Sequence, residues 1–70
     1  MMSERQLWCA DTTLSLAIQI AAEETGVSEQ ELLKKIAASP AYEALYDEET
    51  KLWAAGPAYL LDYIRNFDVI

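Results

Sequence analysis

The scarcity of residues that turn the backbone is the feature that most restricts the fold of this chain. Two glycines and two prolines are too few to connect a series of short strands, and a 53% share of apolar residues is too large for a disordered segment. We therefore predict an all-α domain, a small bundle of three to four short helices that spans residues 1–70. A chain of this length buries roughly 60% of the surface that its unfolded form exposes, so its core is small.

The charged residues restrict the function. Twelve Asp and Glu against five Lys and Arg give a formal net charge of −7, and the chain has no histidine. Such a surface repels the phosphates of nucleic acid and favours a basic protein partner. Without histidine, a nucleophile needs a carboxylate or a desolvated lysine as its base, and no pattern in the sequence pairs Cys9 with either. We predict that the chain is not an enzyme and has no catalytic residue or cofactor.

Cys9 is the only cysteine, so an internal disulfide is excluded and a reducing compartment, the cytoplasm, is favoured. We expect its thiol to behave as a small buried or half-buried apolar group. The longest weakly polar run, residues 14–22, is too short to span a bilayer, and the N-terminal residues lack the pattern of a targeting signal. We therefore expect no membrane partner.

The first helix has two alternative starts. Ser3 followed by Gln6 fits a capping box, in which each residue binds the backbone N–H of the other. The Asp11-Thr12-Thr13 segment offers a second start, which would give a helix over about 12–24 and leave residues 6–10 extended. The sequence leaves both starts open.

The second helix is predicted over about 29–38. Ser28 and Glu31 repeat the capping signature, and Gly26 just before them is suited to end the preceding helix in the left-handed region. Pro40 stops the second helix, because the residue before proline avoids helical angles. A short helix then follows, and after a break at Gly56 a last helix is predicted from Pro57 to about Phe67.

Apolar residues at three- and four-residue spacing predict the buried faces of these helices. The residues assigned to them are Leu14, Leu16, Ala17, Ile18, Ile20 and Ala21 in the first helix, Leu32, Leu33 and Ile36 in the second, and Leu60, Ile64 and Phe67 in the last.

The acidic run 47–49 invites a metal-site interpretation. A calcium loop needs acids at alternating positions and a central glycine, and this run has neither, so we predict no metal site. We expect instead a turn or a helix restart near Asp47. In a restart, Asp47 caps a helix whose first turn holds Glu48 and Glu49, where negative charge is favoured.

The tyrosines and acids of the C-terminal half form the predicted partner-binding surface. Tyr42 and Tyr46 lie one helical turn apart, as do Tyr59 and Tyr63. A tyrosine can present a ring and a hydroxyl at a half-wet surface, where nearby carboxylates attract a cationic, Arg-rich partner. The acids near these tyrosines are Glu43, Asp47 and Asp62. Two alternatives stay open, namely tyrosines that cover the core and tyrosines that form a homodimer contact.

Residues 22–32 resemble the corner of helix-turn-helix proteins and the helix–helix corner of ribbon-helix-helix repressors. The resemblance implies a small DNA-binding regulator, with the strand of the second family over residues 6–10. Glu29 and Glu31 would then face phosphates, and this opposes binding. DNA binding is therefore an alternative function and not the first one.

A wider resemblance is to small uncharacterised bacterial helical proteins encoded beside toxin genes. It is carried by Gly26-Val27-Ser28, by Leu45-Tyr46-Asp47 and by the segment Gly56–Ile64. The resemblance implies an antitoxin-like or accessory binding role without catalysis. We therefore predict a non-enzymatic protein-binding module, antitoxin-like or inhibitory. A further alternative is a phage-encoded inhibitor that mimics nucleic acid.

Overall fold

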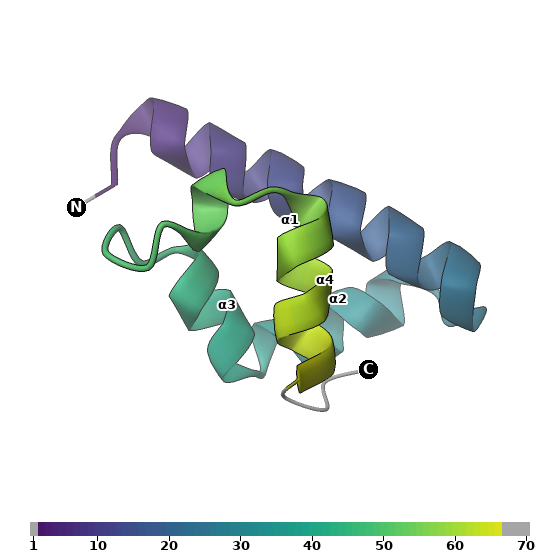
Figure 1. The fold of residues 1–70 in the computed structure, drawn as a ribbon. Helices are drawn as coiled ribbons and strands as arrows, with labels where there is room; N and C mark the ends of the chain where they lie inside the picture. The colour runs from purple at the N-terminus through teal and green to yellow at the C-terminus, as the bar shows by residue number, and fades with distance from the viewer. Residues whose placement is uncertain (1, 67–70) are drawn as a thin grey trace.

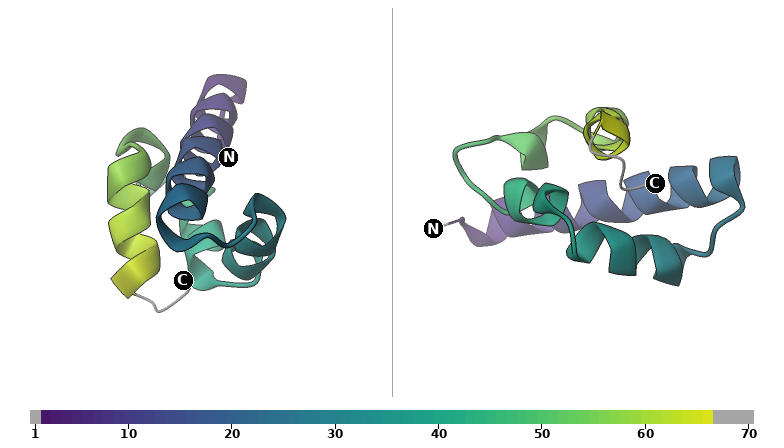
Figure 2. Two further views of the ribbon diagram at one scale, coloured as in Figure 1. Left: turned by 90° about the vertical axis from the view of Figure 1, so that its right-hand side faces the viewer. Right: turned by 90° about the horizontal axis from the view of Figure 1, so that it is seen from below.

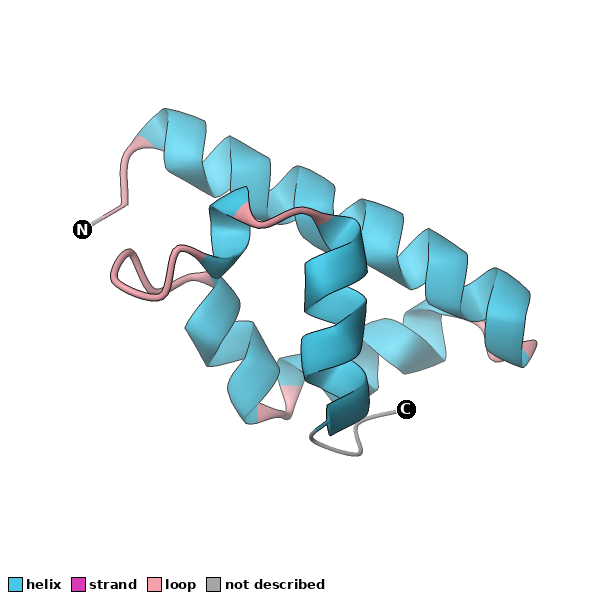
Figure 3. Cartoon of the chain, viewed as in Figure 1, coloured by secondary structure: helices cyan, strands magenta, loops and turns pink. Residues whose placement is uncertain are grey.

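The computed structural model describes residues 2–66, which form helices joined by turns and contain no strand (Figures 1 and 3). The all-α prediction is confirmed. Phe67, the predicted end of the last helix, lies outside the described residues. The elements in chain order are α1 (Glu4–Thr25), α2 (Glu29–Ala37), α3 (Pro40–Leu45), the 3-10 helix η1 (Leu52–Ala54) and α4 (Pro57–Asn66).

The long helix α1 organises the other elements. After the Gly26 corner, α2 runs back along α1, and α3 continues in the same general direction (Figure 2). The chain then returns through η1 to α4, which lies crosswise to α1, and both pack against it. Within residues 2–66, no helix combines the length and the apolar character that a membrane crossing requires.

The first helix begins at the earlier of its two predicted starts. The Gln6 N–H donates to Ser3 Oγ at 3.2 Å, and the Ser3 N–H donates to Gln6 Oε1 at 2.7 Å. This capping box satisfies N–H groups that have no partner in the first turn of a helix, so α1 begins at Glu4. The alternative with an extended segment over residues 6–10 is wrong. The helix ends as expected at Gly26, which has a φ of 76°.

The core is the set of apolar side chains that α1 shares with the elements packed against it. The predicted burial is confirmed for Leu14, Ala17, Ile18, Ala21, Leu32, Ile36, Leu60 and Ile64, and the remaining members are Ala10, Ala41, Leu45, Leu52 and Leu61. Within residues 2–66, every buried polar side-chain atom has a hydrogen-bond partner.

Three leucine and isoleucine side chains predicted to be buried are exposed instead. Leu16, Ile20 and Leu33 are 42%, 36% and 43% exposed. The other elements pack against the side of α1 that carries Leu14 and Ile18, whereas Leu16 and Ile20 lie on the opposite side. Likewise, Leu33 follows the fully buried Leu32 by about 100° around α2, and no element among residues 2–66 covers that side.

Of the two alternatives near Asp47, the helix restart is wrong and the turn is confirmed, because residues 47–50 form a turn. Asp47 Oδ1 accepts from the Glu49 N–H at 2.9 Å, and the Thr50 hydroxyl donates to the Ala44 carbonyl at 2.5 Å. Lys51 then adopts a left-handed φ of 54°, which interrupts any helix. The local bonds of Asp47 therefore stabilise a turn that reverses the chain toward η1.

Candidate functional site

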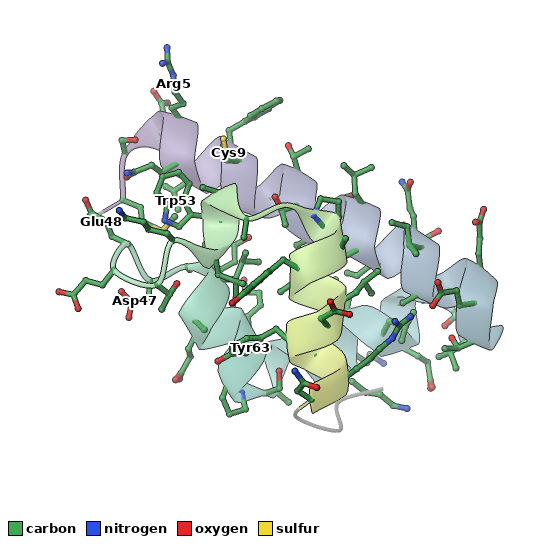
Figure 4. The ribbon with its side chains drawn as sticks, in the orientation of Figure 1. Arg5, Cys9, Asp47, Glu48, Trp53 and Tyr63 are labelled. Carbon is green, nitrogen blue, oxygen red and sulfur yellow. The ribbon has the colours of Figure 1, made fainter. Side chains whose placement is uncertain are left out.

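Four of the predicted site residues come together on α3 and the turn after it. A surface hollow, which we call the acidic hollow, is lined by Met2, Glu43, Tyr46, Asp47, Glu48 and Glu49. Tyr42 lies beside it, with its ring centroid 4.9 Å from that of Tyr46. Figure 4 shows Asp47 and Glu48 in the turn, close to Trp53. The carboxylates are exposed, so the hollow presents concentrated negative charge around one half-buried ring.

Tyr46 is held in place by a long-range contact. Its hydroxyl donates to the carboxylate of Asp11, which lies on α1 and 35 residues away in sequence. Partial burial, together with this carboxylate, raises the pKa of Tyr46 above its ordinary value, because both disfavour the phenolate. The bond ties α3 to α1 and fixes the ring at the edge of the acidic hollow.

The Tyr46 contact predicts a loss of stability at high pH. In the unfolded chain the phenol ionises near pH 10, whereas in the folded protein it keeps its proton to higher pH. The stabilisation that the Tyr46 contact contributes is therefore fully present below about pH 10. It is lost as the pH rises through the pKa of Tyr46 in the folded protein. We expect the free energy of unfolding, measured in urea between about pH 9 and 12, to fall more steeply in the wild type than in Tyr46→Phe. Equal slopes of the unfolding free energy against pH in the two proteins would contradict the contact between Tyr46 and Asp11.

The turn that forms the rim of the hollow is attached to the body of the molecule. The Trp53 indole N–H donates to the Glu48 carbonyl at 3.5 Å, and the Thr13 hydroxyl donates to the Trp53 carbonyl at 3.4 Å. These contacts connect the turn through η1 to the middle of α1. The acidic hollow is therefore connected to α1 at two places, through Tyr46 and through the 47–50 turn.

The three predicted site residues on α4 lie outside the acidic hollow. Tyr63 is half-buried, packs against the core and points from α4 toward α3 (Figure 4). Tyr59, one turn earlier, is 58% exposed, and Asp62 is exposed. The structure thus divides the predicted residues between the hollow beside α3 and a separate tyrosine pair on α4.

Sequence reasoning missed Asp11 as a site residue. Asp11 is separated from Tyr46 by 35 residues, and no local pattern relates the two. Met2, which no pattern in the sequence marks as a site residue, also lines the hollow. Both residues reach the site because α1 runs past α3.

The arrangement of the remaining reactive groups limits the chemistry of the described residues. Cys9 is half-buried, as expected, and with Arg5 it projects from the side of α1 away from the other helices (Figure 4). Within residues 2–66, no cluster of three or more Cys, Asp or Glu side chains could hold a metal ion. The surface of the acidic hollow is electronegative and partly aromatic. Comparisons of the chain with protein-family models, with curated proteins and with solved structures found no match.

Proposed function

We propose that this protein is a non-catalytic binding module whose acidic hollow docks against a basic segment of another protein. The observation that carries the proposal is the gathering of carboxylates around the fixed ring of Tyr46. These carboxylates belong to Glu43, Asp47, Glu48 and Glu49. An Arg side chain can bind a carboxylate through two parallel N–H donors while it stacks on a tyrosine ring.

The exposed carboxylates act mainly by steering the partner. An exposed ion pair contributes only about 0.2–1 kcal/mol, so affinity requires several of them together with the ring. A net charge of −7 accelerates association with a cationic surface, and this effect weakens as salt rises. The exposed ring of Tyr59 on α4 extends the surface available to a partner larger than a peptide.

Within this proposal, the biological setting is an antitoxin-like or inhibitory role in the cytoplasm, with a basic, nuclease-like toxin as the partner. The resemblance to small bacterial helical proteins encoded beside toxin genes supports this setting. A phage-encoded inhibitor that occupies a nucleic-acid site is the alternative that uses the same charges.

The DNA-binding alternative has less support. The Gly26 corner between α1 and α2 exists, but α2 begins with the exposed residues Glu29, Gln30 and Glu31, which oppose phosphate contacts. The ribbon-helix-helix form also requires a strand over residues 6–10, and these residues lie in α1.

Charge reversal at one exposed glutamate tests the proposed function. Glu43→Lys should weaken binding of an Arg-rich peptide about fivefold, because it removes one attraction in the hollow and adds one repulsion. Glu23→Lys, on the exposed part of α1, changes the net charge equally and should weaken binding less than about twofold. Binding is measured by NMR titration, in which the peptide should shift the backbone signals of residues 42–49. Equal effects of the two variants would contradict the proposal.

A further inference from the structure

A second surface of the molecule exposes large apolar side chains. Trp8 is 67% exposed, Leu7 is 40% exposed and Leu33 is 43% exposed. Burial of a tryptophan or leucine side chain is favourable by about 1.5–3 kcal/mol, and a core this small would gain from each. Six other leucines are buried in the helical core, and Leu16, on a different face of α1, is exposed. The nearness of Trp8 and Leu7 on α1 to a groove that Leu33 lines indicates a surface that a partner covers.

These side chains border a groove between α1 and α2. The groove is lined by Asp11, Leu14, Ser15, Ile18, Glu29, Gln30 and Leu33. Leu14 and Ile18 are its apolar floor on α1, and Leu33 is its wall on α2. Asp11 also lines the depression that contains Leu7 and Trp8, so the groove and the depression adjoin at this carboxylate and form one strip of mixed apolar and charged residues along α1.

The strip has the dimensions of a helix-binding site. Leu7, Leu14 and Ile18 lie at i, i+7 and i+11, so they follow one face of α1. At 1.5 Å per residue they extend over roughly 16 Å, which corresponds to about three turns of a partner helix. Helix-in-groove binding uses apolar anchors at this spacing.

The charges at the groove select the partner. Both ionisable side chains that line it, Asp11 and Glu29, are acidic. Arg5 is the basic residue of the neighbouring depression, where Glu4 offsets it. We infer that the groove binds an amphipathic helix of another protein, one that carries Lys or Arg on either side of its apolar stripe.

A second copy of this chain is the less suitable occupant. In a two-fold contact the same surfaces face one another, so Asp11 and Glu29 of one copy would approach those of the other. The net charge of −7 adds a general repulsion between copies. A cationic helix avoids both costs.

Apart from Asp11, which lines the groove and also accepts the hydrogen bond of the Tyr46 hydroxyl, this inference uses other residues than the acidic hollow. The test of the groove substitutes Leu33, and the test of the hollow substitutes Glu43. Either surface can therefore fail its test while the other passes.

The experiment uses Trp8 as its own reporter. In a Trp53→Phe background, whose fold is checked by circular dichroism, Trp8 is the single tryptophan. The probe is a peptide of about 14 residues with leucine on one helical face and lysine elsewhere. We expect saturable binding with a dissociation constant of about 10 μM, and a blue shift of the Trp8 emission as the indole leaves water.

Two matched variants decide the result. Leu33→Lys and Leu16→Lys add the same charge at leucines of nearly equal exposure, 43% and 42%, but only Leu33 lines the groove. Leu33→Lys should weaken binding at least about tenfold and Leu16→Lys less than about twofold. Equal effects of the two substitutions would overturn the inference. Equally tight binding of a control peptide that has the same composition as the probe but no apolar face would also overturn it. A Trp8 blue shift that depends on protein concentration alone would also overturn it, because the occupant would then be a second copy.

Discussion

Leu32→Ala is expected to lower the free energy of unfolding by about 3 kcal/mol, within the range for a fully buried leucine. Leu32 has an exposed fraction of 0% and lies on α2, which packs against both α1 and α3. Truncation removes its apolar contacts and leaves a cavity that the rigid helices fill only in part. A domain of this size has a total stability of about 4–10 kcal/mol, so the variant should keep about 1–7 kcal/mol and unfold at a clearly lower urea concentration than the wild type.

The neighbouring residue supplies the control. Leu33→Ala makes the same chemical change on the same helix, but at a side chain that is 43% exposed. Its cost should stay below about 1 kcal/mol. Both values are measured by urea unfolding followed by circular dichroism. Equal losses for the two variants would show that the helix is not oriented as described.

Ala17→Leu is expected to destabilise the protein by about 2–3 kcal/mol through overpacking. Ala17 lies at the centre of the buried face of α1, with an exposed fraction of 0%, between the equally small Ala10 and Ala21. These alanines leave room for the elements packed against α1 to approach its backbone. The isopropyl group of leucine has no space there, so the neighbouring helices must move apart.

A substitution at an exposed alanine separates overpacking from helix propensity. Alanine and leucine differ little in propensity, so Ala37→Leu, on the exposed end of α2, should change stability by less than about 0.5 kcal/mol. Thermal unfolding of both variants is the measurement. A stable Ala17→Leu protein would mean that the contact between α1 and its neighbours is looser than the structure indicates.

Local signals predicted the helices well, because the groups that begin and end a helix lie within a few residues of each other. Gly26 fixed the end of α1 as expected from capping alone, whereas capping left two starts open and the structure shows the one at Ser3 and Gln6. Asp47 shows the limit of such reasoning: its carboxylate can accept from a helix N–H or from a turn N–H, and the left-handed Lys51 selects the turn.

The candidate sites were less predictable, because they depend on which helix faces are covered. Spacing identified Leu32 and Leu33 as apolar but not which of them α1 and α3 would cover. The bond between Tyr46 and Asp11 likewise depends on a tertiary approach that has no signature within either segment.

The length of α1 has a consequence for how the molecule comes apart. Both the α2 hairpin and the returning η1–α4 segment bury their apolar sides against this one helix, and the ion pair between Arg65 and Glu24 joins its far end to α4. Within residues 2–66, these two groups of elements contact each other mainly through the smaller contacts of α3 with η1 and α4. Unfolding of either group of elements therefore weakens the packing of the other against α1. This dependence is the physical basis of all-or-none unfolding in a domain this small.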